Sequence, residues 1–129
     1  MTRQAPSVRH ADSLEAVDVG AGRATKRRVL IDASEAPNFA LRKFTMQPGG
    51  GMPPHKNSVE HEQYVLRGRA KIGIGDEVYE VAADDVVFIP AGVPHWYEAV
   101  GDEPFEFLCA VPNGPDTIEL VGGGAPTAG

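Results

Sequence analysis

Glycine and proline interrupt this chain at short intervals, and their spacing constrains the fold more than any other feature. The 129 residues include 15 glycines and 11 prolines, and no segment without either residue exceeds 14 residues. A proline inside a helix costs about 3 kcal/mol, and glycine also weakens helices. Helix bundles, coiled coils and helical repeats are therefore disfavoured. Glycine and proline together still fall short of the roughly 25–30% typical of low-complexity disorder, which favours a folded domain of short strands.

Composition and charge narrow the class of protein. A chain of this length with 42% hydrophobic residues can bury one core, so we expect a single domain. A net charge of −6 argues against a nucleic-acid partner. The longest apolar run, residues 107–111, is far shorter than the roughly 20 residues that span a bilayer, and residues 1–12 show no apolar secretory segment. The single cysteine, Cys109, suits a reducing compartment, so we expect a cytoplasmic protein without a membrane partner.

Apolar and polar residues alternate with a period of two between the glycine- and proline-rich turns, which is typical of strands. We expect a polar arm over residues 1–25 that contributes an edge or exchanged strand, a barrel over 26–121, and a flexible tail over 122–129. So many short strands favour a double-sheet jelly roll or a closed barrel. The expected strands are Arg27–Asp32, Phe39–Gln47, Glu60–Arg67, Ala70–Ile74, Glu77–Val81, Asp85–Ile89, His95–Val100, Glu106–Val111 and a short Thr117–Val121.

The same alternation predicts which side chains face the interior. In the last long strand, one face carries only Phe105, Phe107, Cys109 and Val111, so this face is expected to be buried. In the strand over residues 60–67, Glu60 and Glu62 are expected to face water, which turns His61 and Gln63 inward. Buried polar side chains need partners, so an inward histidine and glutamine point to a polar site inside the barrel.

Three of the four histidines lie beside strong turn signals. His55 follows a run of glycines and prolines, His61 is six residues further on, and His95 follows a Pro-x-Gly turn. His10 lies in the polar arm and is expected to be exposed. Three separated histidines alone give only weak evidence for a metal site.

Their spacing resembles the two motifs of the cupin family. The first motif (Gly, five residues, His-x-His, three or four residues, Glu, six residues, Gly) corresponds here to Gly49, His55, Asn57, His61 and Gly68. The second (Gly, five residues, Pro-x-Gly, two residues, His, three residues, Asn) corresponds to Asp84, Pro90, Gly92, His95 and Ala99. The resemblance covers about residues 26–112 and implies an all-β, double-stranded β-helix (jelly-roll) barrel.

The sequence departs from the first motif at two ligand positions. Asn57 stands where the family has its second histidine, and His61 stands where it has glutamate. The stretch over residues 59–68 is similar to small single-domain bacterial cupins that hold a metal with four histidines. The resemblance implies a divalent transition metal (Mn, Fe, Cu, Ni or Zn) bound by His55, His61 and His95, with Asn57 as a weak fourth ligand or a water anchor.

Other residues are candidates for the pocket around such a metal. The expected pocket residues are Arg42, Phe44, Met46, Tyr97, Phe107 and Cys109, and the candidates for a catalytic role are Gln63 and Arg42. Three of these residues also have a purely structural interpretation. Arg42 would be an exposed strand residue, Gln63 an amide at the barrel rim, and Cys109 a small buried hydrophobe.

Three functions follow from the resemblance. The first is a metal-dependent dioxygenase that cleaves a C–C or C=C bond of a small aromatic or enolisable substrate. The second is a non-redox isomerase or lyase acting on a sugar or keto acid, although the sequence offers no convincing inward carboxylate as its base. The third is a non-catalytic cupin that binds a small molecule. Analogy with the family also implies a homodimer.

Overall fold

The computed structural model describes residues 5–121, which form strands connected by turns and one short 3-10 helix, η1 (Ala11–Ser13). The ten strands are β1 (Val17–Asp18), β2 (Arg23–Ile31), β3 (Phe39–Asn57), β4 (His61–Arg67), β5 (Arg69–Ile74), β6 (Glu77–Ala82), β7 (Val86–Ile89), β8 (His95–Val100), β9 (Phe105–Pro112) and β10 (Ile118–Leu120). The expected all-β jelly roll is confirmed. None of the helices described in this range is long and apolar enough to cross a membrane.

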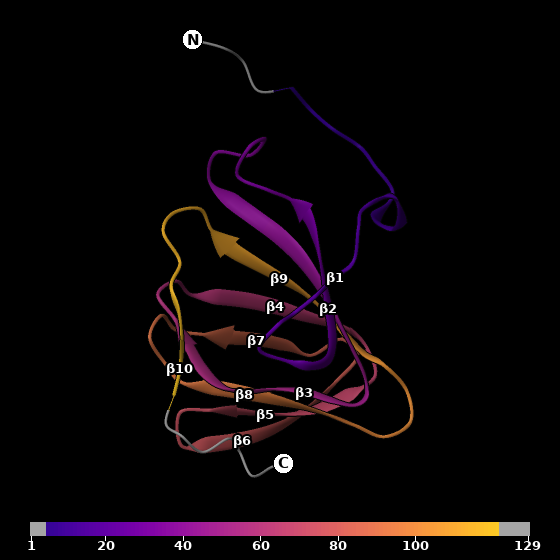
Figure 1. Cartoon of the computed structure of the whole chain (residues 1–129), viewed down its shortest axis with the longest axis vertical. Coiled ribbons are helices and arrows are strands. Elements are labelled where there is room, and N and C mark those ends of the chain that lie inside the picture. Colours follow the sequence, from indigo (N-terminus) through magenta and orange to yellow (C-terminus); the bar gives the residue numbers. More distant parts are fainter. Residues whose placement is uncertain (1–4, 122–129) are drawn as a thin grey trace.

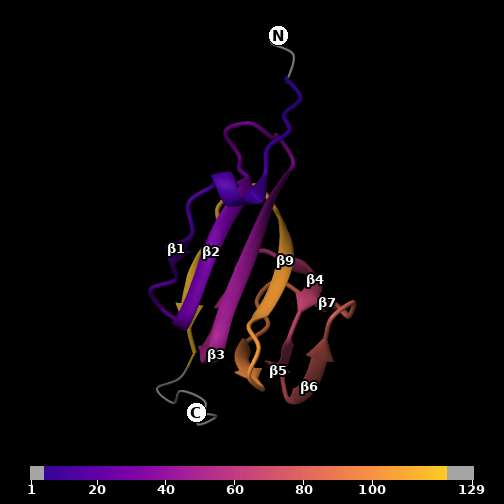
Figure 2. The same ribbon diagram turned by 90° about the vertical axis from the view of Figure 1, so that its right-hand side faces the viewer.

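All ten strands belong to one antiparallel sheet that curls on itself (Figure 1). Its main order is β6-β5-β8-β3-β9-β4-β7, with β2 and β10 also paired to β3, and β1 paired to β2. The first half of β3 lies beside β2 and β9, as Figure 2 shows, and its second half pairs with β8 and β10. The central strand β3 therefore belongs to both layers of the barrel.

The prediction that the strand beginning at Phe39 ends at Gln47 is wrong, because β3 continues to Asn57. Gly49 adopts a φ of +83°, which an L side chain rarely tolerates, and the register with β8 shifts between Met52 and His55. Pro53 and Pro54, which have no amide N–H to donate, lie within that shift. The glycine- and proline-rich segment therefore bends the strand from one layer into the other instead of ending it.

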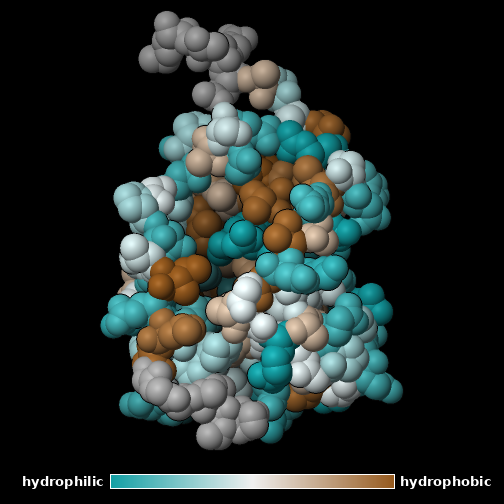
Figure 3. All heavy atoms as spheres, viewed as in Figure 1, coloured by the Kyte–Doolittle hydropathy of each residue, from teal (hydrophilic) through white to brown (hydrophobic). Residues whose placement is uncertain are grey.

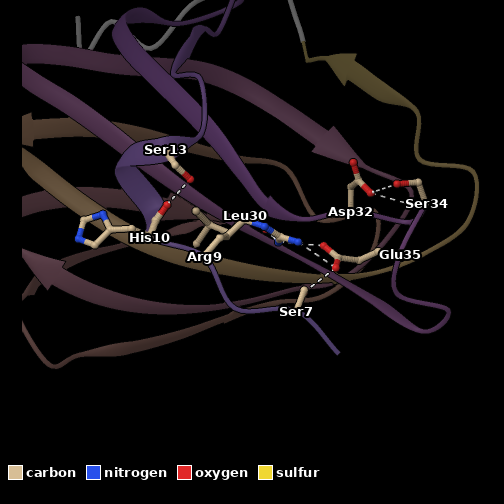
Figure 4. A network of polar contacts seen from close by, with 8 residues as sticks. All are labelled: Ser7, Arg9, His10, Ser13, Leu30, Asp32, Ser34 and Glu35. Atoms are coloured by element: carbon tan, nitrogen blue, oxygen red, sulfur yellow. Dashed lines mark hydrogen bonds and ion pairs between the residues drawn. The ribbon is translucent and has the colours of Figure 1, made fainter. Parts of the chain in front are cut away.

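The N-terminal arm lies against the barrel. Strand β2 begins at Arg23, so residues 23–25, expected in the arm, belong to the sheet, and β1 pairs with β2. Before them, Arg9 donates to the carbonyl of Leu30 (2.9 Å) and pairs with Glu35 (2.9 Å), and Ser7 donates to the same carboxylate (Figure 4). The tail expected over 122–129 lies outside the described residues.

Burial along the strands confirms the predicted alternation. In β9, Phe105, Phe107, Cys109 and Val111 are buried, while the residues between them are partly exposed. In β4, His61, Gln63 and Val65 are buried and Glu62 is exposed. Phe107 stacks on Phe44 (5.0 Å between ring centroids) and on Tyr97 (5.3 Å), which forms a rigid aromatic wall inside the barrel.

Candidate functional site

The three motif histidines meet inside the barrel from three different strands. His55 lies near the end of β3, His61 begins β4 and His95 begins β8. His55 and His95 are direct partners across the β3–β8 ladder, with ring centroids 4.2 Å apart, and the rings of His61 and His95 are 5.7 Å apart. All three side chains are buried. The bend in β3 makes this meeting possible, because it brings His55 beside β8.

Each histidine ring is held through its Nδ1 atom. The Nδ1 atoms of His55 and His95 lie 2.8 and 3.0 Å from the carbonyl oxygens of Pro53 and Val93. A carbonyl can only accept, so these two rings carry their proton on Nδ1 and leave Nε2 with a free lone pair. The Nδ1 of His61 instead lies 3.4 Å from the sulfur of Cys109. The Nε2 atoms of His61 and His95 are buried and have no hydrogen-bond partner.

Asn57 contributes an amide oxygen beside the three histidine side chains. Its Nδ2 donates to the Asp116 carboxylate (3.5 Å), while its Oδ1 is buried without a partner. The Nε2 of His95 and the amide oxygen of Asn57 thus keep unused lone pairs, which suits a transition metal, and the Nε2 of His61 is likewise buried without a partner. Within residues 5–121 no three His, Cys, Asp or Glu side chains already stand in ligating geometry. These residues therefore fit a metal through the type of their donor atoms and their unpaired lone pairs, and not through a preformed ligating geometry.

Burial keeps these histidines neutral. It lowers the pKa of His61 to about 3, helped by the positive charge of Arg42, and the pKa of His95 to about 4, helped by His55. Burial also lowers the pKa of His55. Neutral imidazole is the form that binds metals, so no proton would have to leave these rings near pH 7.

A cavity of about 50 Å³ adjoins the histidines, and its lining is cationic. It includes the three histidines, Asn57, Arg27 and Arg42, and no carboxylate among the described residues. Figure 3 shows one face of the molecule hollowed near its centre, with hydrophilic and hydrophobic residues around the hollow. A larger groove of about 680 Å³ between β6 and β7 has aspartates and a glutamate but no histidine in its lining, so the chemistry is placed in the smaller cavity.

Arg42 has no carboxylate partner within the described part of the chain, although it is only partly exposed. Its guanidinium carbon lies 5.2 Å from the ring centre of Phe44, and one Nη donates to the sulfur of Cys109 (3.4 Å). Its Nε is buried and has no partner. A half-buried cation without a counter-ion is costly, so this side chain can recognise an anionic group.

A hydrogen-bonded pair from β4 and β8 faces the same cavity. Gln63 Nε2 donates to the phenol oxygen of Tyr97 (2.7 Å), and both side chains are buried. Burial raises the pKa of Tyr97, so the phenol remains protonated at neutral pH. Since its oxygen accepts from Gln63, its own O–H can donate to a group inside the cavity.

The family model described as a cupin domain matches residues 42–111, more than half of the chain. The chain belongs to the cupin family. The polyketide cyclase RemF from Streptomyces resistomycificus has a similar structure, with a TM-score of 0.83 and 31% identity, covering 92% of this chain and 87% of that one.

Two curated relatives share a smaller part of their length with this chain. The 1-methylthio-D-xylulose 5-phosphate methylsulfurylase of Rhodospirillum rubrum is 34% identical over 89 residues, 69% of this chain and 56% of that enzyme. The acireductone dioxygenase 1 of Nocardia farcinica is 29% identical over 86 residues, 64% of this chain and 43% of that enzyme. This cupin thus spans about half the length of these relatives.

Most of the predicted pocket residues line the cupin cavity, and two do not. Arg42, Phe44, Tyr97 and Phe107 belong to the lining, together with Gln63. Met46 and Cys109 are fully buried but lie outside the lining. They face inward as predicted, but Met46 packs in the core opposite Phe105, and Cys109 lies behind His61.

Sequence reasoning missed Arg27 as a cavity residue. Arg27 lies opposite Phe44 in the β2–β3 ladder, and its side chain lines the cavity. The alternation along β2 does not decide which way Arg27 faces, because the adjacent apolar residues Val29 and Leu30 lie on opposite faces of the strand.

Proposed function

We propose that this cupin is a metal-dependent dioxygenase that acts on a small, anionic or enolisable substrate. One observation carries the proposal. Three buried, neutral histidines lie together, the Nε2 atoms of His61 and His95 and the Oδ1 of Asn57 have no partner, and the lining of the adjoining cavity includes Arg42 and no described carboxylate. Neutral donors leave a bound cation its full positive charge, which favours an anionic oxygen ligand such as an enolate or a carboxylate.

His55, His61 and His95 would hold the metal, and Asn57 Oδ1 would be a fourth ligand. Imidazole suits Fe, Cu, Ni and Zn, and the amide oxygen also makes Mn acceptable. When bound, such a metal would polarise a substrate oxygen as a Lewis acid and, if redox-active, support reaction with dioxygen. A non-redox cation such as zinc would supply the first of these only.

The chain's own residues would bind and orient the substrate. Arg42 would pair with its anionic group, because no described carboxylate competes for the guanidinium. Tyr97, held by Gln63, would donate a hydrogen bond to a substrate oxygen. Phe44 and Phe107, stacked on each other, would form an apolar wall that excludes water from the bound group.

The lining favours oxygen chemistry over isomerisation. An isomerase or lyase commonly moves a proton with a carboxylate base, and the described cavity lining has none. The curated relative named acireductone dioxygenase is consistent with this choice.

A non-redox cyclase is the second candidate. It is favoured by the likeness to the cyclase RemF over 92% of this chain. In that reaction Tyr97 would serve as the hydrogen-bond donor to a carbonyl as rings close, and dioxygen would not be consumed.

Elemental analysis of tag-free protein tests the metal site. We expect about one transition-metal ion per chain in the wild type and a large loss in His61→Ala, because one of three imidazoles is removed. His10→Ala is the matched control, since His10 is exposed on the arm, and it should keep full stoichiometry. Full metal content in His61→Ala would contradict the ligand assignment.

Oxygen uptake by the metal-loaded protein tests the reaction. We expect consumption of dioxygen with at least one member of a panel of diketones, flavonols and alkenylphenols. Turnover that continues without oxygen would favour the cyclase or an isomerase. Tight ligand retention with no turnover under either condition would show a binding cupin and overturn the enzyme assignment.

A further inference from the structure

Two arginine side chains line the cavity from neighbouring strands. Arg27 on β2 and Arg42 on β3 both belong to the lining. Arg27 is the direct partner of Phe44 in the β2–β3 ladder, and the guanidinium carbon of Arg42 lies 5.2 Å from the centre of the Phe44 ring. Directly opposed residues of an antiparallel pair have Cβ atoms only about 4.5–5.5 Å apart. The two arginines therefore reach the cavity from adjacent positions on the inner face of the sheet.

Neither of these arginines is neutralised by the protein. In the part of the chain that the structure describes, the arginines that pair with carboxylates are others, Arg9, Arg28 and Arg67. Residues 1–4 and 122–129 contain no aspartate or glutamate. Arg27 and Arg42 are both partly buried, and the Nε of Arg42 is buried without a partner. Two neighbouring cations of this kind repel each other and are costly to desolvate, so together they favour a ligand with two negative charges.

The space beside them is small. The cavity measures about 50 Å³, and one water molecule needs roughly 10–15 Å³ of such space, so it holds about three to five groups of that size. A compact anionic head group fits this space, whereas an extended chain with a charge at each end does not. The two negative charges are therefore expected on one group.

The chemistry of the guanidinium group distinguishes the possible anions. A carboxylate carries one charge on two oxygens, and a single arginine can satisfy both of them with its two parallel N–H groups. A phosphate monoester carries a charge of about −1.5 to −2 at pH 7 on three terminal oxygens. It can accept hydrogen bonds from two guanidinium groups at once, so it matches a pair of arginines better than a carboxylate does.

We propose that Arg27 and Arg42 form a binding site for the phosphate group of a phosphorylated small-molecule substrate. The inference deepens the proposed function by naming the substrate class, and it rests on that function for the reaction but not for the binding itself. Arg27 is then a specificity-determining residue, because Arg42 alone would suit a carboxylate.

Calorimetric titration of the metal-free protein with glycerol 3-phosphate at pH 7 tests the site. We expect one ligand to bind per chain. Acetate, which offers a single charge, should bind at least about 10-fold more weakly, because it leaves one arginine without a partner. Glycerol, which lacks the phosphate, should not bind.

Substitution of each arginine tests whether both take part. Arg27→Gln and Arg42→Gln should each weaken the binding of glycerol 3-phosphate about 10- to 100-fold, as the loss of a hydrogen bond to a charged group commonly does. Arg27→Lys keeps the charge but loses the planar arrangement of donors, and should lie between Arg27→Gln and the wild type. Lys26→Gln is the matched control, because it removes one positive charge from an exposed neighbour on the other face of β2, and it should bind as the wild type does. Melting curves show that each variant is folded.

Four results would overturn the proposal. They are no binding of glycerol 3-phosphate, equal affinity for acetate, unchanged affinity in Arg27→Gln, and binding of inorganic phosphate without glycerol 3-phosphate, which would show a site for the free ion. A wild type that binds glycerol 3-phosphate but holds no metal would instead refute the dioxygenase and leave the phosphate site standing. A protein that holds metal but binds no glycerol 3-phosphate would do the reverse.

Discussion

Buried neutral histidines give the metal-free protein a definite response to pH. Burial holds the pKa of His61 at about 3 and that of His95 at about 4, whereas an unfolded histidine has a pKa of about 6.5. Below that value the unfolded chain takes up protons that the folded chain does not. Stability is therefore fully present above pH 6.5 and falls as the pH drops toward 4.

We expect the free energy of unfolding of the metal-free protein to decrease from pH 7 to pH 5. Each buried histidine contributes a slope of up to about 1.4 kcal/mol per pH unit below its unfolded pKa. His61→Leu should remove one such contribution and flatten the curve, while His10→Leu, at an exposed site, should not. Urea unfolding at several pH values measures this. Parallel curves for wild type and His61→Leu would contradict it.

At the residue scale, alternation predicts the side chains that point inward but not what they touch. The outward Glu60 and Glu62 were enough to turn His61 and Gln63 inward. The contact between His61 and Cys109 joins β4 to β9, and the position of Arg27 depends on the β2–β3 register. Such contacts depend on the three-dimensional arrangement of strands, which the local sequence does not encode.

At the scale of elements, β3 carries the site, because one strand supplies Arg42 and Phe44 from one half and His55 and Asn57 from the other. The sequence located the strands well wherever a turn truly ends them. The prediction is wrong at residues 48–54, because glycine and proline occur at a bend within a continuous strand as well as at the end of a strand.

The bend in β3 brings Gly51 into close contact with β8. A Cβ at this position would overlap the backbone carbonyl oxygen of Tyr97 on β8, which cannot move away without breaking the ladder. We expect Gly51→Ala to lower the free energy of unfolding by about 1–3 kcal/mol and to weaken metal binding, because it displaces the strand that holds His95.

Gly20→Ala is the matched control for this substitution. A Cβ there meets nothing within 4 Å, so its stability should stay close to that of the wild type. Chemical denaturation of the three proteins provides the comparison. Equal stability of Gly51→Ala and Gly20→Ala would show that β3 and β8 do not approach each other at Gly51 as closely as in the structure.

At the scale of the whole molecule, the overall charge and the charge of the site have opposite signs. The chain carries a net charge of −6, yet the cavity lining contains two arginines and no described carboxylate. The overall charge underlies the expectation of no nucleic-acid partner, but it says nothing about which small molecule the interior attracts. Function in a barrel of this kind depends on the few residues that face inward.

The arm provides a test of how far this interior is independent of the rest of the chain. Ser7 and Arg9 contact the outer region around Glu35 and Leu30, whereas the cavity lining begins at Val19. Deletion of residues 1–10 should therefore leave Co²⁺ affinity unchanged. It should lower the melting temperature only slightly, because the ion pair that it removes, Arg9–Glu35, is accessible to solvent. Glu35→Gln weakens the same contacts with the arm in place and should match the deletion. A deletion that abolishes Co²⁺ binding while Glu35→Gln does not would show that the arm contributes to the site directly.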